Sequence, residues 1–147
     1  YFVTRTWDQN NKIKYINCSI NKQDIIFNDI NLDWDDDITI VEGPFDLVKA
    51  IENSTCLLGS TLNEESLLFQ KIVKNKTNIT LILDKDANKK MFNIANKFIK
   101  YGVEINVVLL ETDKDTGDMS KKEFADCLKN SVQWDNQQNI LQNIDLI

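Results

Sequence analysis

Four short apolar runs constrain the fold of this chain most strongly. They are rich in β-branched residues, which favour buried strands. The runs lie at 38–42, 55–58, 79–83 and 104–110. Segments with helical spacing follow them, at 45–52, from Thr61 or Asn63 to about 75, and at 88–101. Because strands that alternate with helices form parallel sheets with right-handed crossovers, we expect an α/β fold with a mostly parallel, Rossmann-like four-stranded sheet flanked by helices.

Local signals place the ends of several helices. Pro44, the only proline, suits the first turn of a helix, where its missing N–H would be unpaired anyway. Gly102 is expected to stop the helix at 88–101, because glycine readily adopts the left-handed conformation that ends helices. Ser120 is expected to cap a further helix that runs to about Lys129.

The two ends of the chain differ from this central part. Residues 1–37 predict a small β-hairpin with its turn at 9–11, a short strand at 25–27 and an acidic linker, packed on the core. Residues 38–130 form the predicted α/β domain. Residues 131–147 are a polar, Asn/Gln-rich tail with weak helical spacing and no assigned role. Because residue 1 is Tyr rather than Met, we expect a piece of a longer protein.

The composition excludes several kinds of catalytic and metal site. The chain has no histidine, which excludes histidine general bases, His-containing triads and His-ligated zinc within it. Its three cysteines form no C-x-x-C pair and are expected to be reduced thiols in a cytosol. No apolar run reaches the length of a membrane span, so no membrane partner is expected. A net charge of −6 is the wrong sign for a domain that holds nucleic acid by itself.

Acidic residues follow three of the predicted strands. The groups are Glu42 with Asp46, Asp84 with Asp86, and Asp113 with Asp115 and Asp118. In a parallel sheet the carboxyl ends of the strands share one edge, so the fold would bring these acids together. Bunched carboxylates repel each other unless a cation compensates them, and Mg²⁺ prefers such oxygen ligands. The pattern predicts a divalent-metal site, although single acids in solvated loops are common.

Two other motifs that begin in the same way fit less well. The runs that start at Asp84 and Asp113 resemble the first ligands of a calcium loop, but Lys89 and Asp118 stand where the loop needs glycine. The Asp84-Lys85-Asp86 motif also resembles the nucleophile motif of haloacid-dehalogenase phosphatases. There it normally follows the first strand of the core, whereas here it follows the third, and the earlier Glu42-Gly43 turn is left unexplained.

Taken together, the motifs resemble a toprim domain, the metal-binding module of bacterial-type and phage DNA primases, type IA and II topoisomerases and some nucleases. The first toprim motif, a strand ending in Glu-Gly, is matched by Val41-Glu42-Gly43-Pro44-Phe45-Asp46, which fits the primase pattern Val-Glu-Gly-x-x-Asp. The Asp-x-Asp motif is matched by Asp84-Lys85-Asp86, and a Lys-Asp pair by Lys114-Asp115. The resemblance covers about 38–124. It departs from the family where Asn88 follows Ala87, since the family usually has Ala-Gly.

The resemblance implies roles for these residues. Glu42, Asp84 and Asp86 would be catalytic and, with Asp115, would hold one or two Mg²⁺ or Mn²⁺ ions. Glu42 could instead act as a general acid or base, and the sequence does not choose. The residues that would contact substrate or phosphate are Gly43, Asp46, Lys85, Lys114 and Asp118.

The implied function is that of the toprim part of a phage-like DNA primase, which makes RNA primers on single-stranded DNA by nucleotidyl transfer. Ribonucleoside triphosphates and a DNA template would be partners, the template being held by a basic amino-terminal region outside this chain. A replicative helicase is a further expected partner, and the cytoplasm of a bacterium or phage-infected host the expected location. The alternatives are a toprim nuclease and a non-catalytic interaction module, and the piece alone is expected to be inactive.

Overall fold

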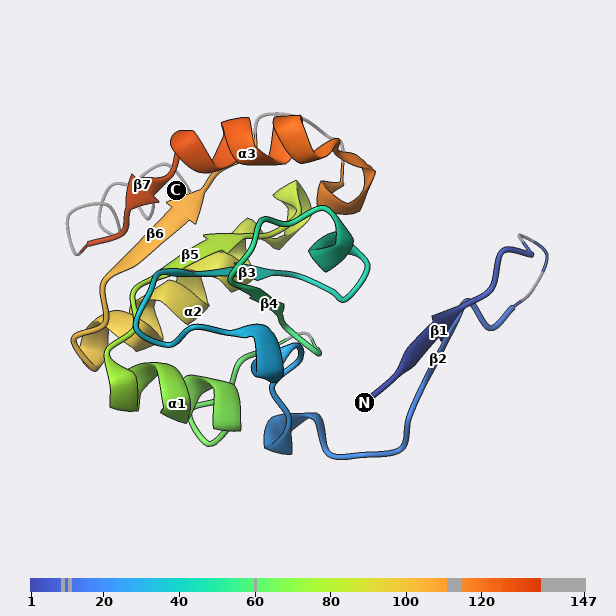
Figure 1. The fold of residues 1–147 in the computed structure, drawn as a ribbon, viewed down its shortest axis with the longest axis horizontal. Coiled ribbons are helices and arrows are strands. Elements are labelled where there is room, and N and C mark those ends of the chain that lie inside the picture. Colours follow the sequence, from blue (N-terminus) through green and yellow to red (C-terminus); the bar gives the residue numbers. More distant parts are fainter. Residues whose placement is uncertain (9, 11, 60, 111–114, 136–147) are drawn as a thin grey trace.

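In the computed structural model, residues 1–8, 10, 12–59, 61–110 and 115–135 are described. A five-stranded sheet lies at the centre, in the order β4-β3-β5-β6-β7 (Figure 1). Its strands are β3 (Ile38–Val41), β4 (Ser54–Cys56), β5 (Ile79–Ile82), β6 (Ile105–Val108) and β7 (Val132–Gln133). The first four pair in parallel and β7 is antiparallel. The predicted α/β fold with a mostly parallel four-stranded sheet is confirmed, and β7 is added to it.

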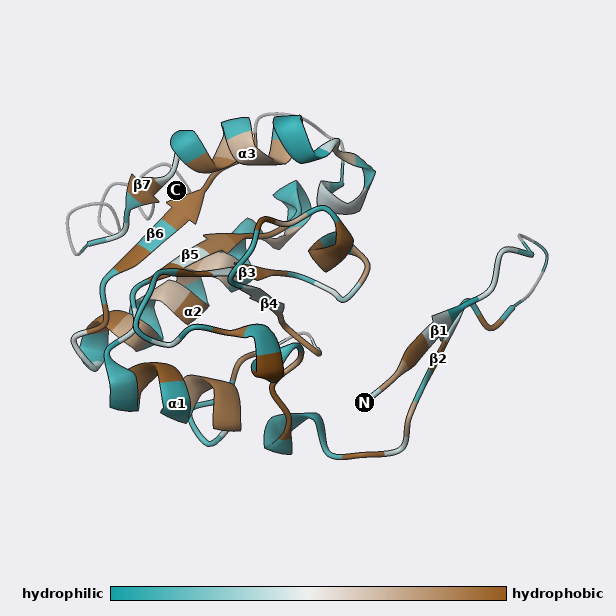
Figure 2. Ribbon diagram, in the orientation of Figure 1, coloured by the Kyte–Doolittle hydropathy of each residue, from teal (hydrophilic) through white to brown (hydrophobic). Residues whose placement is uncertain are grey.

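Helices cover both faces of the sheet. They are α1 (Leu67–Asn75), α2 (Asn88–Lys100) and α3 (Lys121–Lys129). The larger core lies between the sheet and α1 and α2, where the rings of Phe69 and Phe98 stack at 4.4 Å. A smaller core lies on the opposite face, where Phe124 of α3 is fully buried. Figure 2 shows the strands as mainly hydrophobic, as expected for a sheet covered on both sides.

The caps of two helices agree with the sequence. The hydroxyl of Ser120 accepts from the N–H of Glu123, whose carboxylate accepts from the Ser120 N–H, so a complete capping box opens α3. Gly102 follows α2 with a φ of 73°, which favours glycine. For α1 the predicted start was wrong. The helix begins after Ser66, whose hydroxyl accepts from the Phe69 N–H, rather than after Thr61 or Asn63.

The predictions for two other elements were wrong as well. The predicted helix at 45–52 is only a short 3₁₀ turn, η3 (Asp46–Val48). Asn53, at a φ of 53°, then leads the chain into β4. The predicted strand at 25–27 is not formed either. This segment is tied to β4 by side chains instead, since the Thr55 hydroxyl donates to the Phe27 carbonyl at 2.6 Å.

Strand β7 lies in the part of the chain that was predicted to be a polar tail. Trp134, next to it, is buried with 4% of its surface exposed. Its ring stacks on Phe92 of α2 at 4.5 Å, and its indole N–H donates to Asn96 at 2.8 Å. Residues 136–147 lie outside the described residues, and the division into 1–37, 38–130 and 131–147 stays a prediction.

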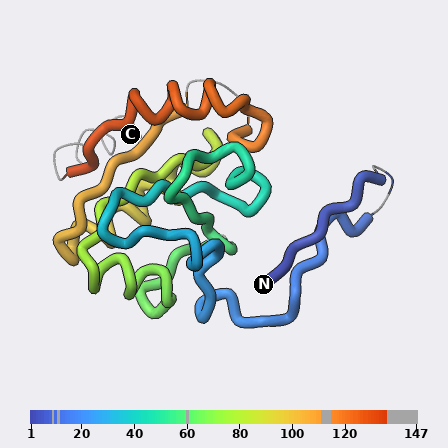
Figure 3. Tube along the Cα trace, in the orientation of Figure 1, coloured from blue at the N-terminus to red at the C-terminus, as the bar shows by residue number. Residues whose placement is uncertain are grey.

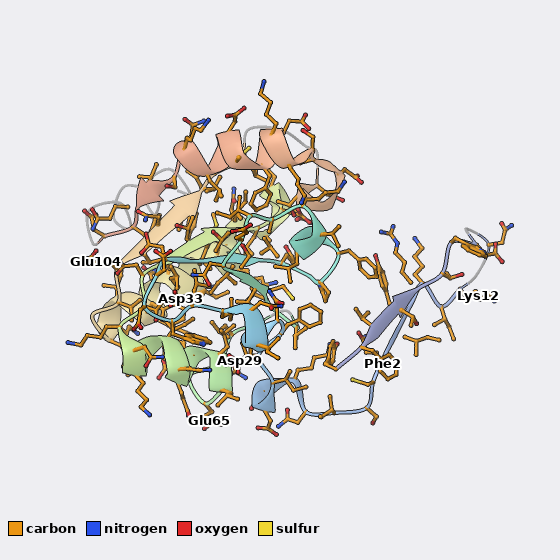
Figure 4. All side chains as sticks on the ribbon, viewed as in Figure 1. Phe2, Lys12, Asp29, Asp33, Glu65 and Glu104 are labelled. Atoms are coloured by element: carbon orange, nitrogen blue, oxygen red, sulfur yellow. The ribbon has the colours of Figure 1, made fainter. Side chains whose placement is uncertain are left out.

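The predicted hairpin is confirmed as β1 (Val3–Arg5) and β2 (Tyr15–Asn17), paired antiparallel with Thr4 opposite Ile16. It stands beside the α/β body and joins it through one extended segment (Figure 3). In Figure 4, Phe2 lies at its near end and Lys12 at its far tip. Ring contacts connect the hairpin to the body, from Tyr1 to Phe27 at 6.0 Å and from Tyr15 to Phe45 at 5.9 Å. Every helix within the described ranges is too short or too polar to cross a lipid bilayer.

Candidate functional site

The acidic segments meet at the carboxyl edge of the sheet, beside a cavity of about 480 Å³. Glu42 directly follows β3, Asp84 follows β5 after one residue, and the loop after β6 returns through the 3₁₀ turn η5 (Thr116–Asp118). The cavity is lined by five acids, by the turn after β3, by Gly117 and by the hairpin. The lining acids are Glu42, Asp46, Asp84, Asp115 and Asp118, and the lining hairpin residues are Val3, Arg5, Tyr15 and Asn17. The fold thus gathers acids that are far apart in the sequence.

The two carboxylate oxygens of Glu42 have different surroundings. Oε1 lies 3.1 Å from the Nζ of Lys90, which α2 brings to the site. Oε2 is buried, and no donor among the described residues reaches it. A buried oxygen without a partner is costly, because it has lost its hydrogen bonds to water. A cation bound at this edge of the sheet would compensate it.

Asp84 is held by the loop after β6. Its Oδ1 accepts from the backbone N–H of Thr116 at 2.9 Å and from the Thr116 hydroxyl at 3.0 Å. Thr116 is fully buried, so these two bonds are shielded from water. They fasten the end of β5 to η5 and fix one oxygen of a predicted metal ligand. No local sequence pattern indicated Thr116, because the contact joins residues 32 positions apart.

Asp46 closes the turn that begins at Glu42. Its Oδ2 accepts from the Gly43 N–H at 2.8 Å. Burial raises the pKa of Asp46, and so do the charges of Asp84 and Glu42, whereas hydrogen bonds from Gly43 and Thr116 lower it. A Cβ at Gly117 would lie only 2.8 Å from Asp46 Oδ1, so glycine lets η5 approach this carboxylate. The structure places Asp46 in a supporting role for the turn, and its contact with substrate stays a prediction.

The pKa of Asp115 shows that the acids at this edge of the sheet affect one another electrostatically. The charge of Asp84 raises the pKa of Asp115 first, followed by burial and by the charges of Asp118, Asp86 and Glu42. Asp115 is nevertheless exposed. Its carboxylate therefore lies in the combined negative field of the other strand ends, and a bound cation would relieve that field.

The remaining predicted residues lie further out or were not described. Asp86 and Lys85 are exposed in the 3₁₀ turn η4 (Lys85–Ala87), and neither lines the cavity. Asp118 does line it. Lys114 lies outside the described residues, as does Asp113.

The hairpin contributes a cationic and aromatic wall beside the acidic residues of the cavity. The guanidinium of Arg5 lies 5.5 Å from the centre of the Tyr15 ring and 5.9 Å from that of Phe45, distances typical of cation–π contacts. Beyond this stack is a second hollow of about 730 Å³, lined by Arg5, Phe45, Trp7 and Lys14 with their neighbours Thr6 and Asp8. The Trp7 side chain is 98% exposed. Cationic and aromatic groups thus border the acidic cavity. The sequence did not reveal this arrangement, because these groups come from different strands and from the turn after β3.

The donor set suits a hard divalent cation. All the acids offer oxygen, and the unpaired Oε2 of Glu42 is an atom that an ion would satisfy. Within the described part of the chain, however, no three acidic side chains already stand close enough to coordinate one ion. Coordination of one ion by three of these carboxylates would therefore need side-chain rotation.

Solved protein structures resemble this chain in fold. No protein-family model matches it, and neither does any curated protein. Among solved structures, the zinc-binding and RNA polymerase domains of the Aquifex aeolicus primase match 90% of this chain, and 37% of their own, with a TM-score of 0.68 at 20% identity. The DnaG catalytic core matches 84% of this chain and 46% of its own, with a TM-score of 0.64 at 16% identity.

A DnaG primase catalytic domain bound to single-stranded DNA also matches, over 85% of this chain and 45% of its own, with a TM-score of 0.64 at 16% identity. The fold is that of a primase catalytic domain. The resemblance noted from the sequence is confirmed at this level. The chain spans less than half the length of each of the three structures, and at these identities the likeness shows the fold alone.

Proposed function

We propose that this chain is the toprim catalytic domain of a phage-like DNA primase, which joins ribonucleotides into RNA primers on single-stranded DNA. One observation carries the proposal: in a primase-type fold, Glu42 and Asp84 end neighbouring parallel strands and line one cavity with Asp115. A fold without these acids would support only an interaction module.

Glu42, Asp84, Asp86 and Asp115 would hold one or two Mg²⁺ or Mn²⁺ ions. When bound, such ions lower the pKa of an attacking hydroxyl and neutralise charge on a leaving pyrophosphate. The chain's own groups prepare this arrangement. Thr116 holds Asp84, Asp46 holds the turn after β3, and Lys90 compensates Glu42.

Ribonucleoside triphosphates and a single-stranded template are the proposed substrates. The acids outnumber the basic residues by 23 to 17, so phosphate contacts by this chain alone would be weak. Arg5, Tyr15 and Phe45 are the side chains beside the cavity that suit a nucleotide, because they combine a cation with aromatic faces. The main template-holding surface is proposed to lie in the rest of the protein. A replicative helicase is a further proposed partner of that whole protein.

The metal part of this proposal is tested by thermal unfolding with and without Mg²⁺. An ion that binds only the native state raises the melting temperature. The wild-type chain is expected to show this rise, and Asp84→Asn/Asp86→Asn to lose it. Asp35→Asn/Asp36→Asn is the matched control, because it removes the same charge from exposed positions in the linker before β3. Equal shifts in wild type and Asp84→Asn/Asp86→Asn would refute the site.

A further inference from the structure

We propose that Thr116 is a positioning residue for the metal ligands of this domain, and that its buried hydroxyl sets the affinity of the cavity for a divalent cation by holding Asp84. The inference rests on the proposed function, since it assumes that Asp84 binds the ion. Thr116 itself is not proposed to touch the ion or the substrate.

The geometry of the contact carries the argument. Both donors of Thr116, its N–H at 2.9 Å and its hydroxyl at 3.0 Å, are directed to the same oxygen, Oδ1 of Asp84. Two donors on one oxygen restrict the rotation of the carboxylate about its Cβ–Cγ bond. Thr116 does not use the second oxygen of Asp84, a residue that lines the cavity. Hydrogen bonds to a charged acceptor are stronger than neutral ones, so this pair is a substantial restraint.

The turn that contains Thr116 also reaches the second acidic segment. There the Asp46 carboxylate accepts from the Gly43 N–H at 2.8 Å. Gly117, the residue after Thr116, permits the close approach to Asp46 Oδ1. The turn that holds Asp84 through Thr116 therefore also lies against Asp46 through Gly117, so η5 contacts the acids that follow both β3 and β5.

The substitution Thr116→Val isolates the hydroxyl. Valine has nearly the same shape and keeps the backbone N–H, so it removes one of the two bonds to Asp84 and little packing. Thr116→Ser restores the hydroxyl, and Thr116→Ala removes it with a smaller side chain. Thr55→Val is the matched control, because Thr55 is also fully buried and its hydroxyl donates to the Phe27 carbonyl at 2.6 Å.

The experiment measures the dissociation constant for Mn²⁺ by the electron paramagnetic resonance signal of the free ion, with the folded state of each variant checked by circular dichroism. Loss of a residue that orients a metal ligand typically weakens affinity by about 10- to 100-fold. We expect a loss of this size in Thr116→Val and Thr116→Ala. Thr116→Ser and Thr55→Val should bind like the wild type.

The outcomes separate this inference from the proposed function. If Asp84→Asn abolishes Mn²⁺ binding while Thr116→Val and Thr116→Ala bind like the wild type, the positioning role is wrong and the metal site stands. If Thr55→Val weakens binding as much as Thr116→Val, the effect is general destabilisation and the positioning role is again wrong. If Asp84→Asn binds Mn²⁺ like the wild type, both the site and the inference fail.

Discussion

Replacement of Lys90 by methionine should lower the stability of the metal-free fold and increase its stabilisation by Mg²⁺. Lys90 is the only cation that the structure shows paired with Glu42 within the described residues, at 3.1 Å. Its side chain is 18% exposed and that of Glu42 is 34% exposed. Lys90→Met keeps the length and apolar stem of the side chain and removes the charge. The metal-free fold should become less stable, and the response to Mg²⁺ should grow.

The size of the first effect follows from the geometry. Two unit charges at this distance attract by about 5 kcal/mol at an effective dielectric constant near 20. Desolvation of Lys90 opposes this attraction, and the exposure of Glu42 screens it further. We therefore expect Lys90→Met to lower the free energy of unfolding by about 1–2 kcal/mol without metal. Urea titration monitored by tryptophan fluorescence measures this change.

The second effect has the opposite sign because Lys90 and the ion compete for Glu42. Without the lysine, the ion no longer shares the charge of Glu42 with a second cation, and the cavity is more negative by one charge. About 1–2 kcal/mol corresponds to roughly a 5- to 30-fold tighter dissociation constant. The stabilisation by a fixed Mg²⁺ concentration should therefore be larger in Lys90→Met than in the wild type.

A second ion pair provides the control. Lys71 of α1 lies 2.8 Å from Asp29, which is labelled in Figure 4, and the two side chains are 33% and 42% exposed. Lys71→Met also removes a charge pair but does not touch the cavity. It should lower stability and leave the Mg²⁺ response unchanged. A smaller or unchanged Mg²⁺ response in Lys90→Met would refute the competition between Lys90 and the ion.

Three further outcomes are expected. Burial and neighbouring acids raise the pKa of Asp46, so the native state holds the Asp46 proton more tightly than the unfolded state does. The contribution of Asp46 to stability is therefore present at acid pH and is lost as pH rises through the raised pKa. Asp46→Asn should therefore be more stable than wild type at neutral pH and lose that advantage near pH 3 in urea titrations; an equal difference at both pH values would contradict this. Trp134→Ala should cost about 3–5 kcal/mol of unfolding free energy because the ring is buried against Phe92, and a cost below about 1 kcal/mol would show that β7 is not part of the core. In fluorescence anisotropy near physiological salt with Mg²⁺, the chain alone should bind a labelled single strand more weakly than about 1 µM; tighter binding would show that the hairpin's cations suffice.

Much of the fold could be predicted because its signals are local. The β-branched runs became β3, β5 and β6, and the Ser120-x-x-Glu123 pair became a complete capping box. Gly102 ended α2 as its backbone freedom suggested. The helix expected after Pro44 is only the 3₁₀ turn η3, where the Asp46 carboxylate accepts from the Gly43 N–H and so offers the backbone an alternative to helical hydrogen bonds.

The parts that could not be predicted depend on contacts between distant residues. Strand β7 is specified by the burial of Trp134 against α2, which no local pattern in the polar tail indicates. In the site, parallel topology was sufficient to bring Glu42 and Asp84 to one edge. The groups that hold them, Lys90 and Thr116, lie 48 and 32 residues away and could be recognised only from their positions in space.

Primer synthesis by the full-length protein that contains this chain tests the central claim most directly. The assay supplies single-stranded DNA, ribonucleoside triphosphates and Mg²⁺, and separates the labelled products by gel electrophoresis. The account predicts short, template-dependent RNA that is absent without Mg²⁺, falls to background in Glu42→Gln and in Asp84→Asn, and persists in Asp35→Asn/Asp36→Asn. Primer synthesis at the wild-type level in Glu42→Gln and Asp84→Asn would contradict it.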